Sequence, residues 1–208
     1  MRFGDRKEAG KLLAKELAQY KGKKAIVLAI PRGGVVIGRV VADELNLPLD
    51  VIVTKKVTPP DNEEYAIGAV GETEVVIDEF AMREAGVRRE DIEQQIMEKQ
   101  LEVGKRYAKF RGSASPPMLK DRIAIIVDDG IATGHTMKAA IAVARHSGAL
   151  KVVAAIPVGP VDGVQELRKL ADEVVCLSEE PVFFAVGEFY DSFPQTEDDE
   201  VVKLLGRR

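Results

Sequence analysis

Apolar runs alternate with amphipathic segments along most of the 208-residue chain. The run AIVLAI at residues 25–30 is apolar throughout, which is typical of a central strand covered on both faces of a sheet. Further strands are expected at residues 49–54, 122–127 and 151–158, and another apolar run, EVVCL, follows at residues 173–177. The alternation predicts an α/β protein with a three-layer, mostly parallel twisted sheet flanked by helices.

Helical periodicity marks the segments between these runs. The first helix is expected to begin near Asp5, whose side chain can cap it, with Glu8 three residues later as in a capping box. Apolar residues then fall on one face at helical spacing: Ala9, Leu12, Leu13, Leu17 and Tyr20. Further helices are expected at residues 35–45, 136–147 and 162–171.

Residues 58–78 interrupt the alternation. They place turn residues around two short β-prone stretches, YAIGAV and EVVID, and this arrangement predicts a long hairpin or a mobile flap. The Gly and Pro content of the segment suits a lid that excludes water from a reaction.

The strongest helical segment covers residues 89–110. One stripe of it is apolar and the opposite positions are mostly charged; the stripe consists of Ile92, Ile96, Val103, Tyr107 and Phe110. The sequence GSASPP at residues 112–117 then returns the chain to the sheet. We therefore expect one domain over residues 1–208, with a flap at 58–78 and a helical insertion at 79–111.

Composition adds limits to this picture. The apolar share is 46% and the charged share is 31%, as in globular proteins, and no apolar run approaches the roughly 18 residues that span a bilayer. The charged first twenty residues lack the apolar stretch of a signal peptide, so we expect a cytoplasmic protein without a membrane partner. The net charge of −4 gives no general attraction to nucleic acid, which makes a nucleic-acid partner an unfavoured interpretation.

Cysteine and histidine are sparse. Cys176 is the single cysteine, so it cannot form an internal disulfide, and its apolar neighbours predict a reduced, buried thiol without chemistry. Two histidines are too few for a His-rich metal cage.

A Gly- and Thr-rich turn, VDDGIATGHT at residues 127–136, follows a predicted strand and opens a predicted helix. It is therefore expected at the carboxyl edge of the sheet, where open α/β folds bind ligands. Gly130 and Gly134 let the backbone approach a ligand closely. Backbone amides at the helix start and the hydroxyls of Thr133 and Thr136 can donate hydrogen bonds to a phosphate.

Two carboxylates precede that turn. Asp128 and Asp129 are poor phosphate ligands but good acceptors for sugar hydroxyls, so together with the turn they predict a ligand with both a sugar and a phosphate. The alternative is that the two acids only cap the strand and the helix, as acids often do at helix starts.

A second anion loop is predicted after the first strand. In AIPRGGVVIG, Gly33 and Gly34 can present backbone amides to another anionic group, and Arg32 adds positive charge. Lys55 and Lys56 follow the second predicted strand and could neutralise a leaving group at the same edge. The alternatives are a simple strand-to-helix connection and a pair of solvated surface lysines.

The segment IIVDDGIATGHT resembles the phosphoribosyl pyrophosphate (PRPP) signature of type I phosphoribosyltransferases, which has apolar residues, two acids and a turn ending in Thr-Gly-x-Thr. The resemblance implies that Asp128 and Asp129 hold the ribose hydroxyls. It also assigns the 5′-phosphate to the turn, with His135 contributing only its backbone: Gly130, Ile131, Ala132, Thr133, Gly134, His135 and Thr136.

Other segments extend the resemblance over nearly the whole chain. PRGG resembles the family's pyrophosphate loop, and Lys55 and Lys56 stand where the family has basic residues. The flap departs from the family because it contains Asp61, Asn62, Glu63, Glu64 and Tyr65 but no Lys or Arg. Together with NEEYAIGAVGE and FFAVGEFYDSF, the pattern is similar to a branch of predicted phosphoribosyltransferases whose acceptor is not established.

The resemblance implies transfer of the 5-phosphoribosyl group from PRPP to a nitrogenous base or amine, with release of pyrophosphate. Asp128, Asp129 and Lys55 would act in catalysis. Mg²⁺ would be the cofactor, held mainly by oxygens of the donor without a dedicated set of protein ligands, and the family's usual assembly is a homodimer. Two alternatives stay open: a non-catalytic PRPP-binding regulator of the same fold, and a phosphohydrolase acting at Asp128.

Aromatic residues gather near the C-terminus, at Phe183, Phe184, Phe189, Tyr190 and Phe193. A planar acceptor could stack on them. The favoured interpretation is that these rings close a small C-terminal hood or a subunit contact.

Overall fold

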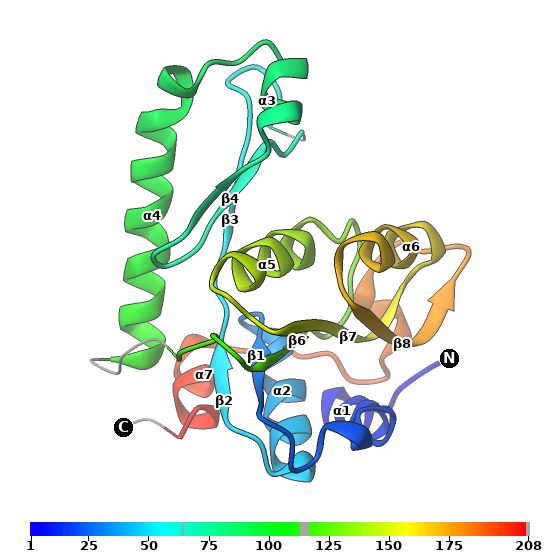
Figure 1. Cartoon of the computed structure of the whole chain (residues 1–208). Coiled ribbons are helices and arrows are strands. Elements are labelled where there is room, and N and C mark those ends of the chain that lie inside the picture. Colours follow the sequence, from blue (N-terminus) through cyan, green and yellow to red (C-terminus); the bar gives the residue numbers. More distant parts are fainter. Residues whose placement is uncertain (64, 113–116, 207–208) are drawn as a thin grey trace.

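The computed structural model describes residues 1–63, 65–112 and 117–206. Its main sheet contains five strands in the order β2-β1-β6-β7-β8, and every neighbouring pair is parallel (Figure 1). The strands are β1 (Ala25–Ala29), β2 (Leu49–Val51), β6 (Ile123–Val127), β7 (Lys151–Pro160) and β8 (Glu173–Glu180). The carboxyl ends of these strands therefore share one edge of the sheet.

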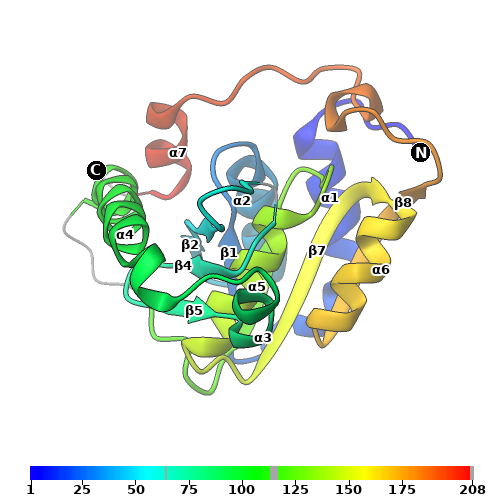
Figure 2. The same cartoon turned by 90° about the horizontal axis from the view of Figure 1, so that it is seen from above.

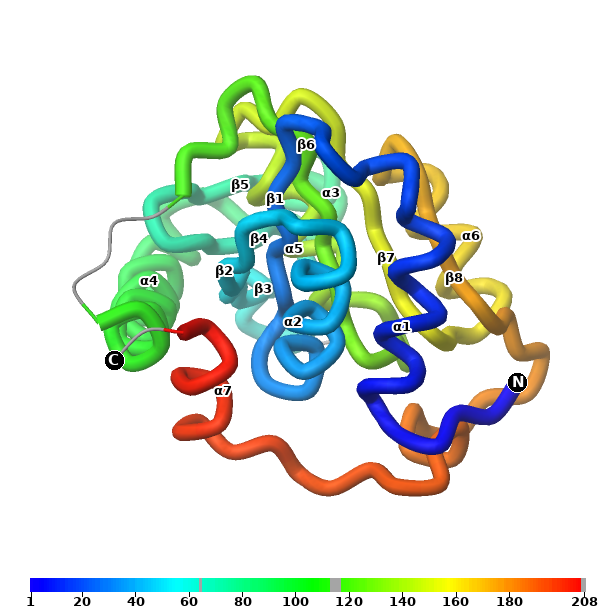
Figure 3. The backbone as a smooth tube through the Cα atoms, turned by 90° about the horizontal axis from the view of Figure 1, so that it is seen from below, coloured from blue at the N-terminus to red at the C-terminus, as the bar shows by residue number. Residues whose placement is uncertain are grey.

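Helices cover both faces of this sheet. Figure 2 looks onto α5 (His135–His146) and α6 (Val161–Leu170), and Figure 3 looks onto α1 (Arg6–Glu16), α2 (Gly33–Leu45) and α7 (Asp198–Leu204). The predicted three-layer α/β fold is confirmed.

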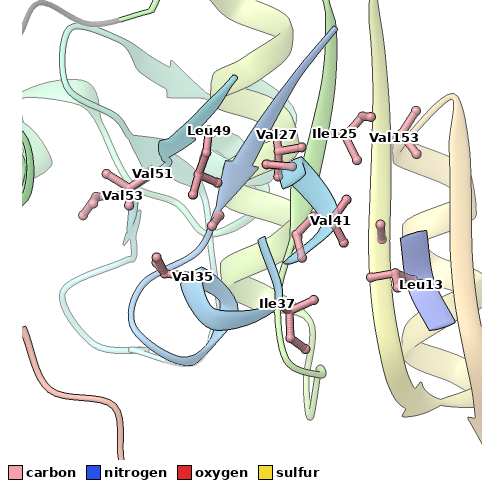
Figure 4. Packing of buried hydrophobic residues seen from close by; sticks show 14 of the residues in the cluster. Leu13, Val27, Val35, Ile37, Val41, Leu49, Val51, Val53, Ile125 and Val153 are labelled. Carbon is pink, nitrogen blue, oxygen red and sulfur yellow. The ribbon is translucent and has the colours of Figure 1, made fainter. Parts of the chain in front are cut away.

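Two buried apolar clusters match the two faces of the sheet. Val27 of β1 packs in the cluster under α1 and α2, where Figure 4 shows it near Val41, whereas its neighbour Leu28 packs in the cluster under α5 and α6. The alternation follows from the strand geometry, because successive side chains point to opposite faces. Strands with both faces covered need continuous apolar runs, which explains the pattern in the sequence.

A smaller antiparallel sheet stands beside the main one. It contains β3 (Lys55–Val57), β4 (Gly68–Val70) and β5 (Val75–Ile77), in that order. The predicted hairpin within residues 58–78 is present as β4 and β5, while Glu64 lies outside the described residues. Figure 1 shows α4 on one side of this sheet and α5 on the other.

The predicted long helix is α4 (Arg89–Arg111), preceded by the short helix α3 (Glu79–Glu84). Its apolar stripe is buried as expected: Ile92, Ile96, Val103, Tyr107 and Phe110. Most of the predicted linker after it, residues 113–116, lies outside the described residues.

Three expectations need correction. The second strand ends at Val51 rather than at residue 54, so Lys55 and Lys56 do not directly follow it but form the start of β3. The second helix begins two residues earlier than expected, at Gly33. Cys176 is only partly buried, because β8 is an edge strand; its burial still raises the pKa of the thiol to about 11.

A buried ionic cluster fastens α4 to the main sheet. The side chains of Arg111 and Asp50 are 3% and 2% exposed, and Arg111 Nε donates to both Asp50 oxygens at 3.0 and 3.1 Å. Arg111 also pairs with Glu72 and lies over the ring of Tyr107, 4.1 Å from its centroid. The Tyr107 hydroxyl accepts a hydrogen bond from the Val53 amide at 2.9 Å, and burial raises the pKa of Tyr107 to about 12. Each charge is paired, as burial of charges requires.

No helix within the described ranges combines the length and the apolar character that crossing a bilayer would need.

Candidate functional site

The Gly- and Thr-rich turn connects β6 to α5. Gly130 has φ +155° and Gly134 has φ +71°, backbone conformations that side chains disfavour. Ile131 anchors the turn: its amide donates to the Val158 carbonyl at 3.1 Å, and its side chain is 4% exposed. A Cβ on Gly159 would stand 2.6 Å from Ile131, so glycine there makes room for the anchor.

The residues that follow Ile131 are accessible to a ligand. Ala132, Thr133 and Thr136 are exposed, and His135 is half-buried. Within the described residues, no hydrogen bond occupies the backbone amides of residues 132–134. The first amides of α5 also have no partner inside their own helix, and the helix dipole adds partial positive charge there. The turn can therefore bind an anion such as a phosphate.

The two adjacent acids have different surroundings. Asp128 Oδ1 accepts a hydrogen bond from the Asp129 amide at 2.9 Å. Burial and the negative charge of Asp129 raise the pKa of Asp128 well above its usual range, while Arg6 opposes this effect. Asp129 instead forms an ion pair with Arg6, whose Nε lies 2.8 Å from Asp129 Oδ2; the two side chains are 9% and 15% exposed.

The PRGG loop rests directly on these acids. Strands β1 and β6 are neighbours, and the Ile30 amide donates to the Val127 carbonyl at 2.9 Å. A Cβ on Gly33 would overlap Asp129 Oδ2, and one on Gly34 would stand 2.9 Å from Asp128 Cα. Because only hydrogen occupies these positions, the two turns meet at one edge of the sheet. The peptide bond between Pro31 and Arg32 is cis.

A cavity of about 370 Å³ lies between the start of β3 and the Gly- and Thr-rich turn. Its lining consists of Thr54, Lys55, Lys56, Thr133, His135, Thr136 and Ala139. The structure therefore brings both predicted lysines beside the turn, although they belong to the smaller sheet.

Two of the predicted cations already have carboxylate partners. Lys55 Nζ lies 2.8 Å from Glu102 of α4, and both side chains are largely exposed. Arg32 Nη1 lies 3.7 Å from oxygens of both Glu197 and Asp198 near the start of α7. The Lys55 pair is exposed and the Arg32 pairs are at least partly solvated, and such pairs contribute little free energy, so a multiply charged anion can compete for these cations.

The C-terminal aromatic residues pack mainly on the protein itself. Phe183 stacks on Phe189 with a centroid separation of 5.1 Å, and Tyr190 contacts Phe193 at 4.9 Å. The interpretation as a small hood agrees with these contacts. Phe184 differs, because it is 80% exposed and remains accessible to a planar ligand.

This hood, residues 183–193, also reaches the acids. The Tyr190 hydroxyl donates to the Asp129 carbonyl at 2.6 Å, and burial raises its pKa. The guanidinium of Arg6 lies 3.7 Å from the centroid of Phe193. Arg6 is the residue that sequence reasoning missed. The available signal was an unusual one, a cation at the first position of a helix, where the dipole favours anions.

Comparison with known proteins identifies relatives over the full chain. A model of the phosphoribosyl transferase domain matches residues 5–192. Over 206 residues, the chain is 47% identical to two proteins named "Putative phosphoribosyl transferase" from Mycobacterium tuberculosis strains CDC 1551 / Oshkosh and H37Rv. The matches cover 99% of this chain and 46% of each relative, so the chain spans about half the length of these curated relatives.

A solved structure shows the same fold. The crystal structure of TT1426 from Thermus thermophilus has a TM-score of 0.90 and 40% sequence identity to the chain. The superposition covers 99% of this chain and 98% of that one, so it includes the smaller sheet and α4 as well as the main sheet.

Proposed function

The chain belongs to the phosphoribosyl transferase family. On that premise, we propose that it transfers the 5-phosphoribosyl group of PRPP to a nitrogenous base or amine and releases pyrophosphate. The observation that carries the proposal is the contact between the PRGG loop and the paired acids, with Gly33 against Asp129 and Gly34 against Asp128. This contact places the PRGG loop against the two carboxylates, which supports the proposal that one phosphorylated sugar binds both.

In this proposal the 5′-phosphate binds the turn after β6. The open amides of residues 132–134 and the start of α5 would donate to it, together with the hydroxyls of Thr133 and Thr136. Gly130, Ile131, Ala132 and His135 would contribute through the backbone.

The ribose would lie over Asp128 and Asp129, whose carboxylates accept hydrogen bonds from its hydroxyls. Arg6 holds Asp129 Oδ2, and Asp128 Oδ1 accepts a hydrogen bond from the Asp129 amide. Each acid therefore has a defined orientation before the ligand arrives, which reduces the reorganisation that binding requires.

The pyrophosphate would bind on the PRGG side. Amides at the start of α2, at Gly33 and Gly34, can donate to it, and Arg32, Lys55 and Lys56 supply positive charge. Leaving-group charge develops as the bond to C1 of the ribose breaks, so cations fixed in advance stabilise the transition state. The residues act by positioning and charge, and no protein nucleophile is required.

Mg²⁺ fits these residues as part of its complex with the donor. Among the described residues, no group of three or more His, Cys, Asp or Glu side chains could hold a metal, whereas pyrophosphate supplies the hard oxygen ligands that Mg²⁺ prefers. When bound, the ion would neutralise and orient the leaving pyrophosphate.

Calorimetric titration with PRPP and Mg²⁺ tests donor binding. We expect saturable binding by the unmodified protein. Thr133→Val should weaken it about tenfold, because a hydrogen bond to a charged group contributes about 1.5 kcal/mol or more. Ser147→Ala is the control, since it also removes a hydroxyl, but at the opposite end of α5, where Ser147 donates to the Val143 carbonyl. Absence of PRPP binding would overturn the proposal.

Incubation of the bound donor with a panel of purine and pyrimidine bases and amines then tests transfer. Release of pyrophosphate with one acceptor class would support the transferase and identify the acceptor. Tight binding without release across the panel would instead assign the chain as a PRPP-binding regulator.

A further inference from the structure

Arg6 occupies a position that opposes two physical preferences. It is the first residue of α1, where its charge meets the positive end of the helix dipole, and it is only 8% exposed. Removing a guanidinium from water is costly unless it is paired. A residue whose charge and burial are unfavourable for its own helix often has a functional contact with another part of the structure.

The partners of Arg6 come from three separated segments. Its Nε donates to Asp129 Oδ2 at 2.8 Å, and its Nη1 donates to the Pro194 carbonyl at 2.7 Å. Its guanidinium lies over Phe193. A Cβ on Gly33 would stand 3.0 Å from Arg6 Nε. Arg6 therefore contacts the acid turn, the PRGG loop and the C-terminal hood at the point where they meet.

We propose that Arg6 is a positioning residue for the ribose of the donor, holding Asp129 so that one carboxylate oxygen is fixed and the other faces the ligand. This inference rests on the proposed function. The two oxygens of Asp129 differ: Oδ2 accepts a hydrogen bond from Arg6, whereas in the described part of the chain the further side-chain hydrogen bond to Asp129 comes from Asp128 when Asp128 is protonated.

Arg6 also acts on the neighbouring acid. The charged and titratable groups that face Asp128 are Asp129 from the same turn, Arg6 from α1 and Tyr190 from the hood. Burial and Asp129 raise the pKa of Asp128, and Arg6 lowers it. Loss of the Arg6 charge would therefore raise the pKa of Asp128 further and narrow the pH range in which Asp128 is ionised.

The affinities of three ligands distinguish positioning of Asp129 by Arg6 from a purely structural contact between Arg6 and the hood. PRPP, ribose 5-phosphate and inorganic pyrophosphate are each titrated with Mg²⁺ into the unmodified protein, Arg6→Met and Arg6→Lys. Arg6→Met should weaken PRPP and ribose 5-phosphate about tenfold or more, since the acceptor for a ribose hydroxyl loses its fixed orientation. Pyrophosphate should be weakened less than these two probes, because Arg6 hydrogen-bonds to Asp129 and reaches only Gly33 of the proposed pyrophosphate site, away from Lys55 and Lys56.

Arg6→Lys keeps the charge and should recover part of the ribose 5-phosphate affinity, and it carries the test if Arg6→Met does not fold. Arg39→Met is the matched control: it also removes an arginine–aspartate pair, with Asp43, but on the surface of α2. The pH midpoint of PRPP binding should move upward in Arg6→Met and stay unchanged in Arg39→Met.

The outcomes are distinguishable. Failure of the unmodified protein to bind PRPP would overturn the proposed function itself. If the unmodified protein binds PRPP but Arg6→Met weakens all three probes equally, with an unchanged pH midpoint, Arg6 only fastens the hood and the inference is wrong.

Discussion

Gly33 lies against Asp129 so closely that a methyl group on Gly33 would overlap the carboxylate oxygen bound by Arg6. Gly33→Ala should therefore displace Asp129 and lower PRPP affinity about tenfold or more, since an acceptor for a ribose hydroxyl is lost. The unfolding free energy should also fall, by up to about 3 kcal/mol, because a displaced Asp129 pairs less well with the buried guanidinium of Arg6. Calorimetric titration and urea unfolding measure the two effects.

Gly104→Ala is the control for this change. Gly104 lies within α4, and a Cβ there would have no neighbour within 4 Å. We expect a gain of about 1 kcal/mol in unfolding free energy and unchanged PRPP affinity. Equal affinities of the two alanine variants would show that the Gly33 contact does not serve the donor.

Asp128 and Asp129 should respond oppositely to removal of their charge. Asp128→Asn keeps an acceptor for the Asp129 amide and removes a partly buried charge beside another acid, so the unfolding temperature should rise. Asp129→Asn leaves Arg6 without its carboxylate and should cost about 3 kcal/mol. Both should weaken PRPP binding about tenfold or more. Equal destabilisation by the two changes would favour the view that the acids only cap the turn.

The raised pKa of Asp128 gives a signed pH dependence. In the unfolded chain an aspartate titrates near about 3.9, whereas folded Asp128 takes up its proton at higher pH. Its contribution to stability is therefore fully present below about 3.9 and is lost as the pH rises through the folded pKa. The excess stability of Asp128→Asn over the unmodified protein should be largest at alkaline pH and shrink on acidification. Thermal unfolding of both proteins between about pH 4 and 9 measures this difference.

Much of the fold could be predicted because the order of apolar and polar residues within a segment indicates which of its faces are buried. The strands of the main sheet are continuous apolar runs, and the stripe on α4 has helical spacing, so each segment carries its own signal. The smaller sheet was harder to place. Strand β3 is short and begins with Lys55 and Lys56, whose polarity gave no strand signal, and it is defined by pairing with β4.

The site likewise has parts that could be predicted from contiguous sequence and parts that could not. The turn and the PRGG loop could be found because each is a contiguous stretch after an apolar strand. Arg6 could not, since it meets Asp129 across 123 positions of the chain. The partners of Lys55 and Arg32 were missed for the same reason, because Glu102 and Asp198 come from distant helices. Closure of the flap stays a prediction.

The buried cluster around Arg111 should be structural rather than functional. Arg111→Leu would remove the guanidinium that bonds to both oxygens of Asp50, whose side chain is 2% exposed, and should lower the unfolding free energy by about 3 kcal/mol. Lys105→Leu, on an exposed position of α4, is the control and should change it by less than about 0.5 kcal/mol. Urea unfolding compares them, and PRPP affinity of the folded Arg111→Leu protein should be near that of the unmodified protein. A selective loss of affinity would place Arg111 in the site.

Glu102 pairs with Lys55 and therefore affects the charge of the proposed pyrophosphate site. Its pair with Lys55 lowers the pKa of Glu102 and holds the lysine toward α4. Glu102→Gln should release Lys55 and strengthen pyrophosphate binding by about two- to fivefold, since an exposed ion pair competes only weakly for the lysine. Glu98→Gln changes the net charge equally but affects a carboxylate that bonds to Gln94 on the same helix. If Lys55 serves the leaving group, only Glu102→Gln gains affinity, and the gain disappears in a Lys55→Gln background. Equal gains in both glutamine variants would instead reflect net charge alone and would remove Lys55 from the site.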